Sequence, residues 1–316
     1  MKALGLLSGG LDSTLAARIL IEQGIEVSAI NFTSPFCTCT AKGASCAAVV
    51  TAVRQLGDIP LKRVALGDEY LRMVRKPEHG RGRGMNPCID CRIMKIRKAG
   101  EYMHRIGASF LFTGEVLGQR PMSQHRRALA LIDRESGFGD RTLRPLSAMH
   151  LPPTVPEQRG WVNRAGFLGL SGKTRRPQMA LAAEKGIADY PCPAGGCRLT
   201  DRHFAERLSD YFAHTESPSI NDMALLRVGR HFRAESLEKV VVARNEGEGE
   251  MLKKLAGPDD HLLVPLFPAP VVLLRGREVG EALCKLRRYS KLDDVENPSV
   301  VDHYRGSRTM LPLTVS

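Results

Sequence analysis

Short apolar runs alternate with amphipathic stretches through the first third of the chain. Apolar or alternating runs at residues 3–7, 26–32, 62–66 and 109–113 predict four strands. Amphipathic stretches at 14–23, 46–56 and 88–105 predict helices between them. Gly24 is placed to cap the C-terminus of the first helix. Strand, helix and strand in this order indicate a βαβ unit and a parallel sheet.

The pattern is less regular in the middle of the chain and changes again after it. Residues 128–135 predict another strand, and 175–185 and 203–212 predict helices. Ser217-Pro218-Ser219 has the composition of a linker. Beyond it, short strand-like runs at 225–232, 239–243, 261–265 and 271–274 are interleaved with helices near 248–255 and 279–289. We therefore predict an α/β, Rossmann-like parallel-sheet domain over residues 1–216 and a smaller α+β domain over 217–316.

Length and charge narrow the class of protein. A chain of 316 residues can bury the cores of two domains. No stretch resembles a signal-peptide h-region or approaches the length of a membrane span, so we expect a cytoplasmic protein without a membrane partner. The net charge is +12, and residues 72–127 hold 13 Lys and Arg against 4 Asp and Glu. This local excess favours a polyanionic partner such as a nucleic acid.

The first candidate for chemistry is the turn between the first strand and the first helix. Its sequence is Ser8-Gly9-Gly10-Leu11-Asp12-Ser13. Such a turn leaves backbone N–H groups unpaired at a helix N-terminus, where the helix dipole favours an anion. The glycines allow close approach of a phosphate, the serines offer hydroxyl donors, and Asp12 either orients the turn or holds Mg²⁺. A second glycine string at residues 169–174 ends in Gly-Lys-Thr but lacks the first Walker glycine, because Phe167 occupies that place.

The second candidate is the set of eight cysteines. In a cytoplasmic protein they favour metal binding or catalysis over a disulfide framework. Seven fall in clusters along the chain: Cys37, Cys39 and Cys46, then Cys88 and Cys91, then Cys192 and Cys197. The first trio could bind a second metal, although loop cysteines at this spacing are more often small apolar residues. Cys284 stands outside the clusters.

Four motifs in this order resemble those of PP-loop tRNA thiolation enzymes, the 4-thiouridine synthases and their 2-thiouridylase relatives. They are the turn at residues 8–13, Asn86-Pro87-Cys88-Ile89-Asp90-Cys91, the stretch from Thr113 to Pro121, and Pro193-Ala194-Gly195-Gly196-Cys197. The resemblance implies an adenine nucleotide α-hydrolase-like fold that splits ATP into AMP and pyrophosphate. It implies that Ser8, Gly9, Gly10, Leu11, Asp12, Ser13, Thr113, Gly114 and Gln119 bind the nucleotide. Asp12, Cys88 and Cys197 would be the catalytic residues.

The C-terminal part resembles the RNA-binding domain of NFACT ribosome-associated proteins. The carrying residues are Val228-Gly229-Arg230-His231-Phe232-Arg233 and Val241-Val242-Ala243-Arg244-Asn245-Glu246. Together the two resemblances imply an ATP-dependent tRNA sulfurtransferase that adenylates a uridine oxygen and replaces it with sulfur, giving 4-thiouridine. The implied partners are tRNA, ATP and a sulfur source, either sulfide or a donor such as a cysteine desulfurase.

Three hypotheses for the sulfur step stay open. In the first, Cys88, Cys91 and Cys197 hold a [4Fe-4S] cluster that activates hydrosulfide, with Cys192 as the alternative third ligand. In the second, Cys88 and Cys197 act as a persulfide pair, as in a 2-thiouridylase. In the third, Cys88, Cys91, Cys192 and Cys197 bind a structural Zn²⁺ in place of the cluster.

Two other functions compete with thiolation. One is a PP-loop synthetase that adenylates a small molecule, against which the basic segment argues. The other is a non-catalytic, zinc-containing protein that binds RNA or the ribosome, against which the intact turn at residues 8–13 argues. The sequence leaves open which uridine is modified, whether C2 or C4 receives sulfur, and whether two protomers form a homodimer around one tRNA.

Overall fold

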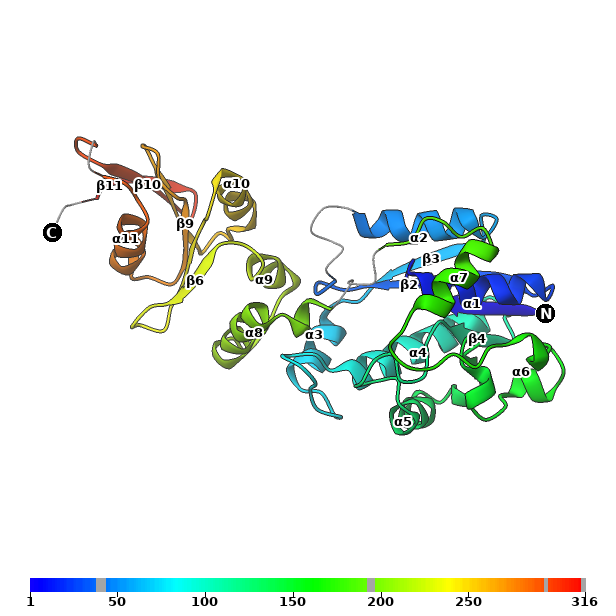
Figure 1. The fold of residues 1–316 in the computed structure, drawn as a ribbon. Helices are drawn as coiled ribbons and strands as arrows, with labels where there is room; N and C mark the ends of the chain where they lie inside the picture. The colour runs from blue at the N-terminus through cyan, green and yellow to red at the C-terminus, as the bar shows by residue number, and fades with distance from the viewer. Residues whose placement is uncertain (38–43, 192–196, 293–294, 314–316) are drawn as a thin grey trace. The chain divides into compact units, whose positions relative to one another are not determined.

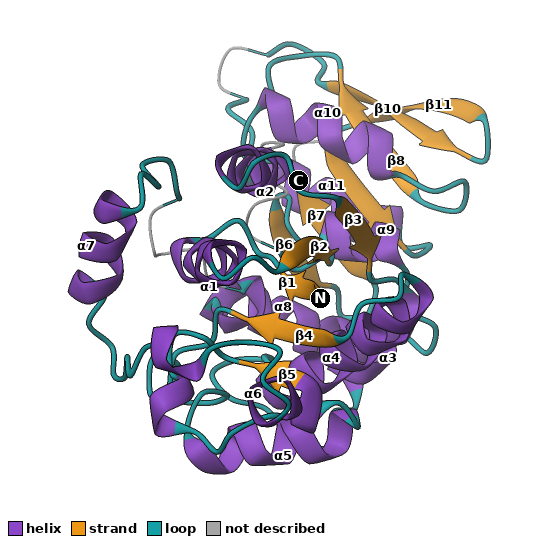
Figure 2. Ribbon diagram, turned by 90° about the vertical axis from the view of Figure 1, so that its right-hand side faces the viewer, coloured by secondary structure: helices purple, strands orange, loops and turns teal. Residues whose placement is uncertain are grey.

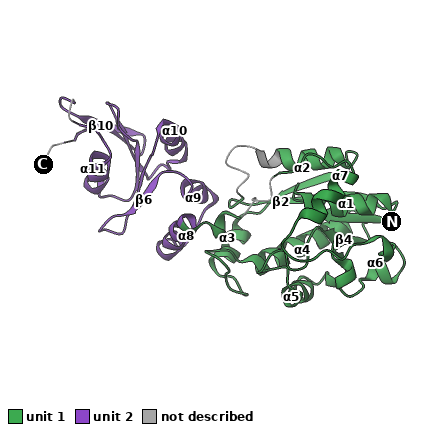
Figure 3. Ribbon diagram, viewed as in Figure 1, with its two compact units in different colours: residues 1–202 green, residues 203–316 purple. Residues whose placement is uncertain are grey.

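The computed structural model describes residues 1–37, 44–191, 197–292 and 295–313, with the side chains of 44–46 left out. The chain divides into two compact units, residues 1–202 and 203–316 (Figure 3). The sequence places the boundary after residue 216, whereas the contacts assign nearly all of helix α8 (Arg202–His214) to the second unit. The predicted order, a parallel-sheet α/β unit followed by a smaller α+β unit, is confirmed.

The first unit is built on a parallel five-stranded sheet (Figure 1). Its strands, in the order β3-β2-β1-β4-β5, are Leu61–Ala65, Glu26–Thr33, Lys2–Leu6, Phe110–Thr113 and Thr142–Leu143. The chain runs outward from β1 to β3 and then returns to place β4 on the other side of β1. The strand order therefore reverses between β1 and β4, and in open α/β sheets ligands bind at the carboxyl ends of the strands at such a switch point.

Helices cover both faces of this sheet (Figure 2). Neighbouring residues of β1 point to opposite faces, so Ala3 packs in one hydrophobic cluster and Leu4 in another. The cluster around Ala3 includes buried residues of α1 (Leu11–Glu22), α2 (Ala44–Gln55) and α7 (Arg176–Glu184). The cluster around Leu4 includes those of α4 (Cys88–Arg105) and α5 (Arg126–Ser136). Among the described residues of the unit, the remaining helices are α3 (Asp68–Arg75), α6 (Val155–Gln158) and short 3₁₀ turns at residues 139–141, 148–150, 164–166 and 198–200.

The strand predicted at residues 128–135 is wrong, because this segment is helix α5. Its buried positions follow a helical spacing: Ala128, Leu129, Ile132 and Ser136. The His125 side chain accepts a hydrogen bond from the Ala128 N–H at 3.2 Å, and Gly137, at φ +76°, ends the helix. The apolar run resembles a strand, but the two caps and the buried stripe determine the helix.

The second unit is an antiparallel six-stranded sheet with helices on both faces. Its strands, in the order β11-β10-β8-β9-β7-β6, are Ser307–Pro312, Ser299–Tyr304, His261–Pro265, Val272–Arg275, Lys239–Val242 and Arg230–Arg233. Helix α11 (Val279–Arg288) packs on one face. Helices α9 (Ile220–Leu225) and α10 (Glu246–Leu255) pack on the other. No helix in the ranges described above is long and apolar enough to cross a membrane.

The predicted strand at 225–232 is also wrong in part. Leu225 ends α9, and β6 begins only at Arg230. Gly229 lies between them at φ +74°, and a Cβ there would come within 2.7 Å of the carbonyl oxygen of Val242. The sharp, close turn at this glycine therefore separates the helix from the strand.

Candidate nucleotide and sulfur site

The predicted site residues that the structure describes gather at one edge of the parallel sheet. The turn at residues 8–13 follows β1, and Thr113-Gly114 ends and follows the neighbouring strand β4. Cys37 follows β2, and Cys88 and Cys91 lie in the first turn of α4. Cys192 lies outside the described residues, as do Pro193 to Gly196 and Cys39, and so does the side chain of Cys46.

The turn after β1 has the geometry that an anion site needs. Gly9 adopts φ +77°, and a Cβ on it would lie 2.6 Å from the backbone of Ala48 and Val49 in α2. Gly10 is the N-cap residue of α1 and provides no side-chain cap. The first N–H groups of α1 therefore have no side-chain partner from the capping position, which leaves donors for an anionic ligand.

The two serines of this turn have different roles. The Ser13 hydroxyl is buried and donates to the carbonyl of Gly10 at 2.9 Å, and it accepts from the N–H of Ser8 at 3.2 Å. Ser13 thus stabilises the turn from inside. The Ser8 side chain is exposed, with its hydroxyl 3.1 Å from that of Ser13. The Ser8 hydroxyl also accepts a hydrogen bond from the Gly10 N–H at 3.3 Å, and of the two serines it is the one that solvent reaches.

The end of β4 lies directly against the N-terminus of α1. A Cβ on Gly114 would lie 2.4 Å from the backbone nitrogen of Ser13, so only glycine fits here without a shift of the backbone. Thr113 is buried and donates its hydroxyl to Glu115 at 3.2 Å. Glu115 in turn pairs with Arg92 and Arg144. Burial raises the pKa of the Glu115 carboxyl, but the two arginines outweigh it and hold the pKa below its usual value.

Asp12 is held by a polar network that the sequence predicts only in part. Its Oδ2 accepts from Gln119 Nε2 at 2.8 Å and from Arg175 at 3.0 Å. Gln178 donates to the Gln119 side-chain oxygen at 3.3 Å. Three buried atoms of this network have no hydrogen-bond partner among the residues that the structure describes: Asp12 Oδ1, Arg175 Nε and Gln178 Oε1. Buried unpaired polar atoms are rare in proteins, so this network has the unmet hydrogen-bonding capacity of a ligand site.

Arg175 and Gln178 follow the second glycine string, residues 169–174. Ser171 forms a parallel β-bridge with Leu117, and the Gly172 N–H donates to the Leu117 carbonyl at 2.7 Å. The string therefore lies beside Gly118 and Gln119, although its spacing fails as a Walker loop. The sequence signal that could have found Arg175 is the glycine string directly before it. Spacing along the sequence does not show that this string lies near the turn at residues 8–13.

Cys88 and Cys91 contact different partners. Cys91 accepts a hydrogen bond from the hydroxyl of Tyr70, a buried residue of α3, at 3.3 Å. Cys88 donates to the Ser123 hydroxyl at 3.1 Å. Burial raises the pKa of Cys91, but Lys95, the Tyr70 hydrogen bond and Arg92 together bring it below its usual value. Cys91 therefore loses its proton more readily than an ordinary cysteine.

Cys197 lies opposite Cys37. The two residues form an isolated antiparallel β-bridge, and the Arg198 N–H donates to the Phe36 carbonyl at 3.0 Å. Burial raises the pKa of Cys197 to about 11. The pKa of Tyr70 is raised well above its usual value by burial and by Cys91, Cys197 and Cys37. The Tyr70 hydroxyl thus contacts Cys91 and interacts electrostatically with Cys197 and Cys37, and the sequence patterns did not single out Tyr70.

The described thiols do not by themselves form a close three-thiolate set for a Zn²⁺ ion, and Cys192, a further ligand in the zinc hypothesis, lies outside the described residues. Zn²⁺ binds sulfur at about 2.3 Å, which requires its thiolates to lie close together. Among the described residues, no three cysteine sulfurs lie within 4.8 Å of one another. An iron–sulfur cluster is larger and accepts more widely spaced thiolates. Cys88, Cys91 and Cys197 have the donor chemistry for it, with Arg92 and Lys95 nearby to offset thiolate charge.

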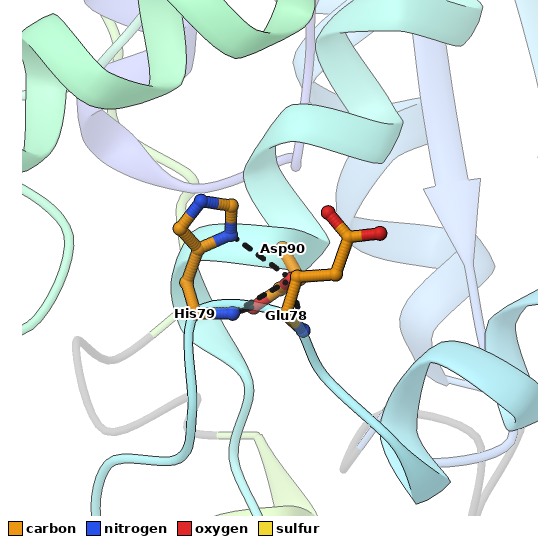
Figure 4. Close-up of side chains that lie close together, drawn as sticks. All are labelled: Glu78, His79 and Asp90. Carbon is orange, nitrogen blue, oxygen red and sulfur yellow. Dashed lines mark hydrogen bonds and ion pairs between the residues drawn. The ribbon is translucent and has the colours of Figure 1, made fainter.

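Asp90, inside the Cys-x-x-Cys turn, anchors the loop at residues 77–87. Its carboxylate accepts from the N–H groups of Glu78 at 2.9 Å and His79 at 3.3 Å, and it lies 3.2 Å from His79 Nδ1 (Figure 4). At the other end of the loop, the Met85 N–H donates to the Leu199 carbonyl at 2.9 Å. The glycine-rich loop is therefore tied to the segments that carry Cys88, Cys91 and Cys197.

Strand, glycine turn and helix at the switch point of a parallel sheet are the arrangement of an α/β nucleotide-binding domain. Residues 1–151 match the ThiI family, described as thiamine biosynthesis protein, and residues 229–312 match the NFACT protein RNA binding domain. The match to the ThiI family thus lies within the first unit, and the match to the NFACT protein RNA binding domain lies within the second.

Individual relatives are similar over parts of the chain. A tRNA-specific 2-thiouridylase of Dichelobacter nodosus is 29% identical over 218 residues, which cover 66% of this chain and 54% of the relative. One of Francisella tularensis subsp. novicida is 25% identical over 276 residues, covering 83% and 70%. The chain thus spans about half of the length of the first of these relatives.

Solved structures with a similar chain path include a 4-thiouridine synthetase–RNA complex with bound ATP. It is 22% identical, with a TM-score of 0.41, over 71% of this chain and 52% of that one. Another is the U34-tRNA thiolase NcsA from Methanococcus maripaludis with its [4Fe-4S] cluster. It is 18% identical, with a TM-score of 0.35, over 72% of each chain.

Proposed function

We propose that this protein is an ATP-dependent tRNA sulfurtransferase that converts a tRNA uridine to a thiouridine, with 4-thiouridine as the expected product. The proposal rests on one observation: two half-sites, one for the nucleotide and one for sulfur, lie at the same edge of the parallel sheet. The uncapped glycine turn at α1 is suited to phosphates. The thiols of Cys88, Cys91 and Cys197 lie at the same edge, on segments that the loop at 77–87 connects.

The turn and the Asp12 network would hold ATP for the activation step. The uridine carbonyl oxygen attacks the α-phosphorus of ATP, a P–O bond breaks, and pyrophosphate leaves. The N–H groups at Gly9 and Leu11 and the Ser8 hydroxyl would stabilise the charge on pyrophosphate. Asp12 Oδ1, which has no partner in the structure, is the atom suited to Mg²⁺, while Gln119 and Arg175 hold Oδ2.

In the second step a sulfur nucleophile attacks the activated carbon, its C–O bond breaks, and AMP leaves. The charge of Arg120 interacts with Cys88 and with Asp12, one residue from each half-site. We propose Cys88, Cys91 and Cys197 as ligands of a [4Fe-4S] cluster, which when bound would supply an activated sulfide. Tyr70 positions Cys91 through its hydrogen bond. A persulfide pathway through Cys88 and Cys197, fed by a cysteine desulfurase, is the alternative.

The proposal gives tRNA two contact regions. The basic segment at 72–127 offers cations near the site, although Arg92 and Lys98 are engaged with carboxylates and Arg81 donates to backbone carbonyls. The NFACT-type domain provides the second region. The names of the curated relatives, tRNA-specific 2-thiouridylases, support tRNA thiolation as the class of reaction and make 2-thiouridine the alternative product.

The test is anaerobic incubation of the purified protein with ATP, sulfide and an unmodified tRNA transcript. AMP release and the thionucleoside, separated by mass and chromatography, are measured together. We expect AMP release that depends on tRNA and a product identified as 4-thiouridine. Cys88→Ala and Cys197→Ala should lose thiolation while retaining tRNA binding, and Cys284→Ala, at an exposed cysteine, is the matched control. Normal thiolation in every cysteine variant would refute the mechanism.

A further inference from the structure

Two aromatic rings and two cations form one patch on the second unit. Phe232 of β6 and Tyr289, the C-cap residue of α11, have ring centroids 5.8 Å apart at an interplanar angle of 34°. The Arg230 guanidinium lies over the Tyr289 ring, 4.9 Å from its centroid. The Lys285 ammonium lies over the Phe232 ring at 5.3 Å. Both rings pack against the core on one side and are only partly buried.

The two cations of this patch differ from several other cations of the unit in their partners. Many cations are neutralised: Arg233 and Lys239 by Asp210, Arg244 by Glu248, Arg275 by Asp222 and Asp260, and Arg305 by Asp259. Within residues 203–292 and 295–313, neither Arg230 nor Lys285 has an ion pair with a carboxylate. Aromatic surface and unpaired positive charge therefore coincide at this patch.

We propose that Arg230, Phe232, Lys285 and Tyr289 bind an unpaired nucleotide of RNA. Unpaired bases stack on aromatic rings and on arginine guanidinium planes, and the adjoining phosphates are attracted by cations. A paired base is stacked on both faces inside a duplex, so it cannot use such a patch. The site deepens the proposed function, since it names where the RNA-binding domain would hold a single-stranded part of its RNA.

The test compares RNA binding of full-length variants by fluorescence anisotropy at several salt concentrations. The probes are a labelled oligouridine, an RNA duplex of equal length, and tRNA. Tyr289→Leu keeps an apolar side chain but removes the ring, and should weaken oligouridine binding by about 5- to 150-fold, the worth of one stacked base. Duplex binding should change much less.

The charge variants and a control complete the test. Arg230→Gln and Lys285→Gln should each weaken oligouridine binding. Each should also reduce by about one the slope of the logarithm of affinity against the logarithm of salt concentration. Arg305→Gln is the matched control, because Arg305 also lies over a ring, that of Tyr304 at 5.3 Å, but is paired with Asp259. It should bind like the wild type.

The inference is overturned if the Arg230 and Lys285 variants bind oligouridine as the wild type does, or if duplex binding falls equally. These two exposed or half-buried substitutions decide the matter even if Tyr289→Leu fails to fold. Thiolation is measured separately. If the variants lose oligouridine binding but the wild-type protein never thiolates tRNA, the result supports this site and refutes the proposed function.

Discussion

Gly114→Ala tests the geometry of the nucleotide half-site most sharply. The added Cβ would lie 2.4 Å from the backbone nitrogen of Ser13 and 2.5 Å from the carbonyl carbon of Asp12. Both are backbone atoms, so no side chain can rotate away. To reach an ordinary contact of at least 3.4 Å, the start of α1 must move away from β4 by about 1 Å. That movement displaces the N–H groups proposed to hold pyrophosphate.

The expected cost follows from this overpacking. Adding a methyl group to a closely packed site costs about 1–3 kcal/mol. If the bound state resists the shift, ATP affinity falls by roughly 5- to 150-fold. If the free protein bears the strain, the midpoint of urea unfolding falls instead. Because a displacement of about 1 Å can slow catalysis roughly 100-fold, AMP formation should fall in either case.

The assay is ATP binding by calorimetry, urea unfolding and single-turnover AMP release on the same preparations. Gly280→Ala is the control, since a Cβ at that helical glycine meets nothing within 4 Å. It should leave ATP binding unchanged. Wild-type ATP affinity, stability and AMP release in Gly114→Ala would show that β4 and α1 do not approach as the structure has them.

Three further predictions concern other parts of the molecule. Asp12→Asn keeps the shape of the side chain but removes the charge that pairs with Arg175, so tRNA-dependent AMP formation should fall by roughly 100-fold; an unchanged single-turnover rate would contradict the role given to Asp12. Tyr70→Phe removes the hydrogen bond that lowers the pKa of Cys91, so alkylation of Cys91 at pH 8 in metal-free protein should slow several-fold, and peptide mapping that shows no change would refute it. Burial lowers the pKa of His231 to about 3 from the unfolded value of 6.5. The neutral His231 side chain therefore contributes its full share of the free energy of unfolding above pH 6.5, and this contribution is lost as the pH falls toward 3. At pH 5 the loss should be about 2 kcal/mol in the urea unfolding of the second unit, and His231→Gln should flatten this dependence.

The sequence predicts four strands of the parallel sheet, β1 to β4, from short apolar or alternating runs between turn signals, whereas the two-residue strand β5 was not predicted. Gly24, for example, follows α1 at φ +77°, as a C-cap glycine does. The strand wrongly placed at 128–135 has the apolar composition of a strand, and its identity as α5 depends on a cap at His125 and on packing against α4. Strands β10 and β11 pair with each other, and they were not predicted because apolar and polar residues alternate only weakly along them.

The site was predictable where one motif carries it and not where the fold brings distant residues together. The turn at 8–13 is local, so its position after β1 follows from the sequence. Arg175 reaches Asp12 across more than half of the chain, and Tyr70 reaches Cys91 from a helix that was not predicted. Cys37 was assigned to a separate trio, but the structure pairs it with Cys197 across a β-bridge. Such contacts arise from tertiary packing, and single-sequence patterns do not contain them.

The most direct measurement of the central claim is the ratio of AMP to thionucleoside in a single anaerobic reaction with ATP, sulfide and tRNA transcript. The proposed two-step chemistry predicts one AMP for each thiouridine and no AMP without tRNA. AMP formed without tRNA, or tRNA bound with neither AMP nor a thionucleoside formed, would contradict it.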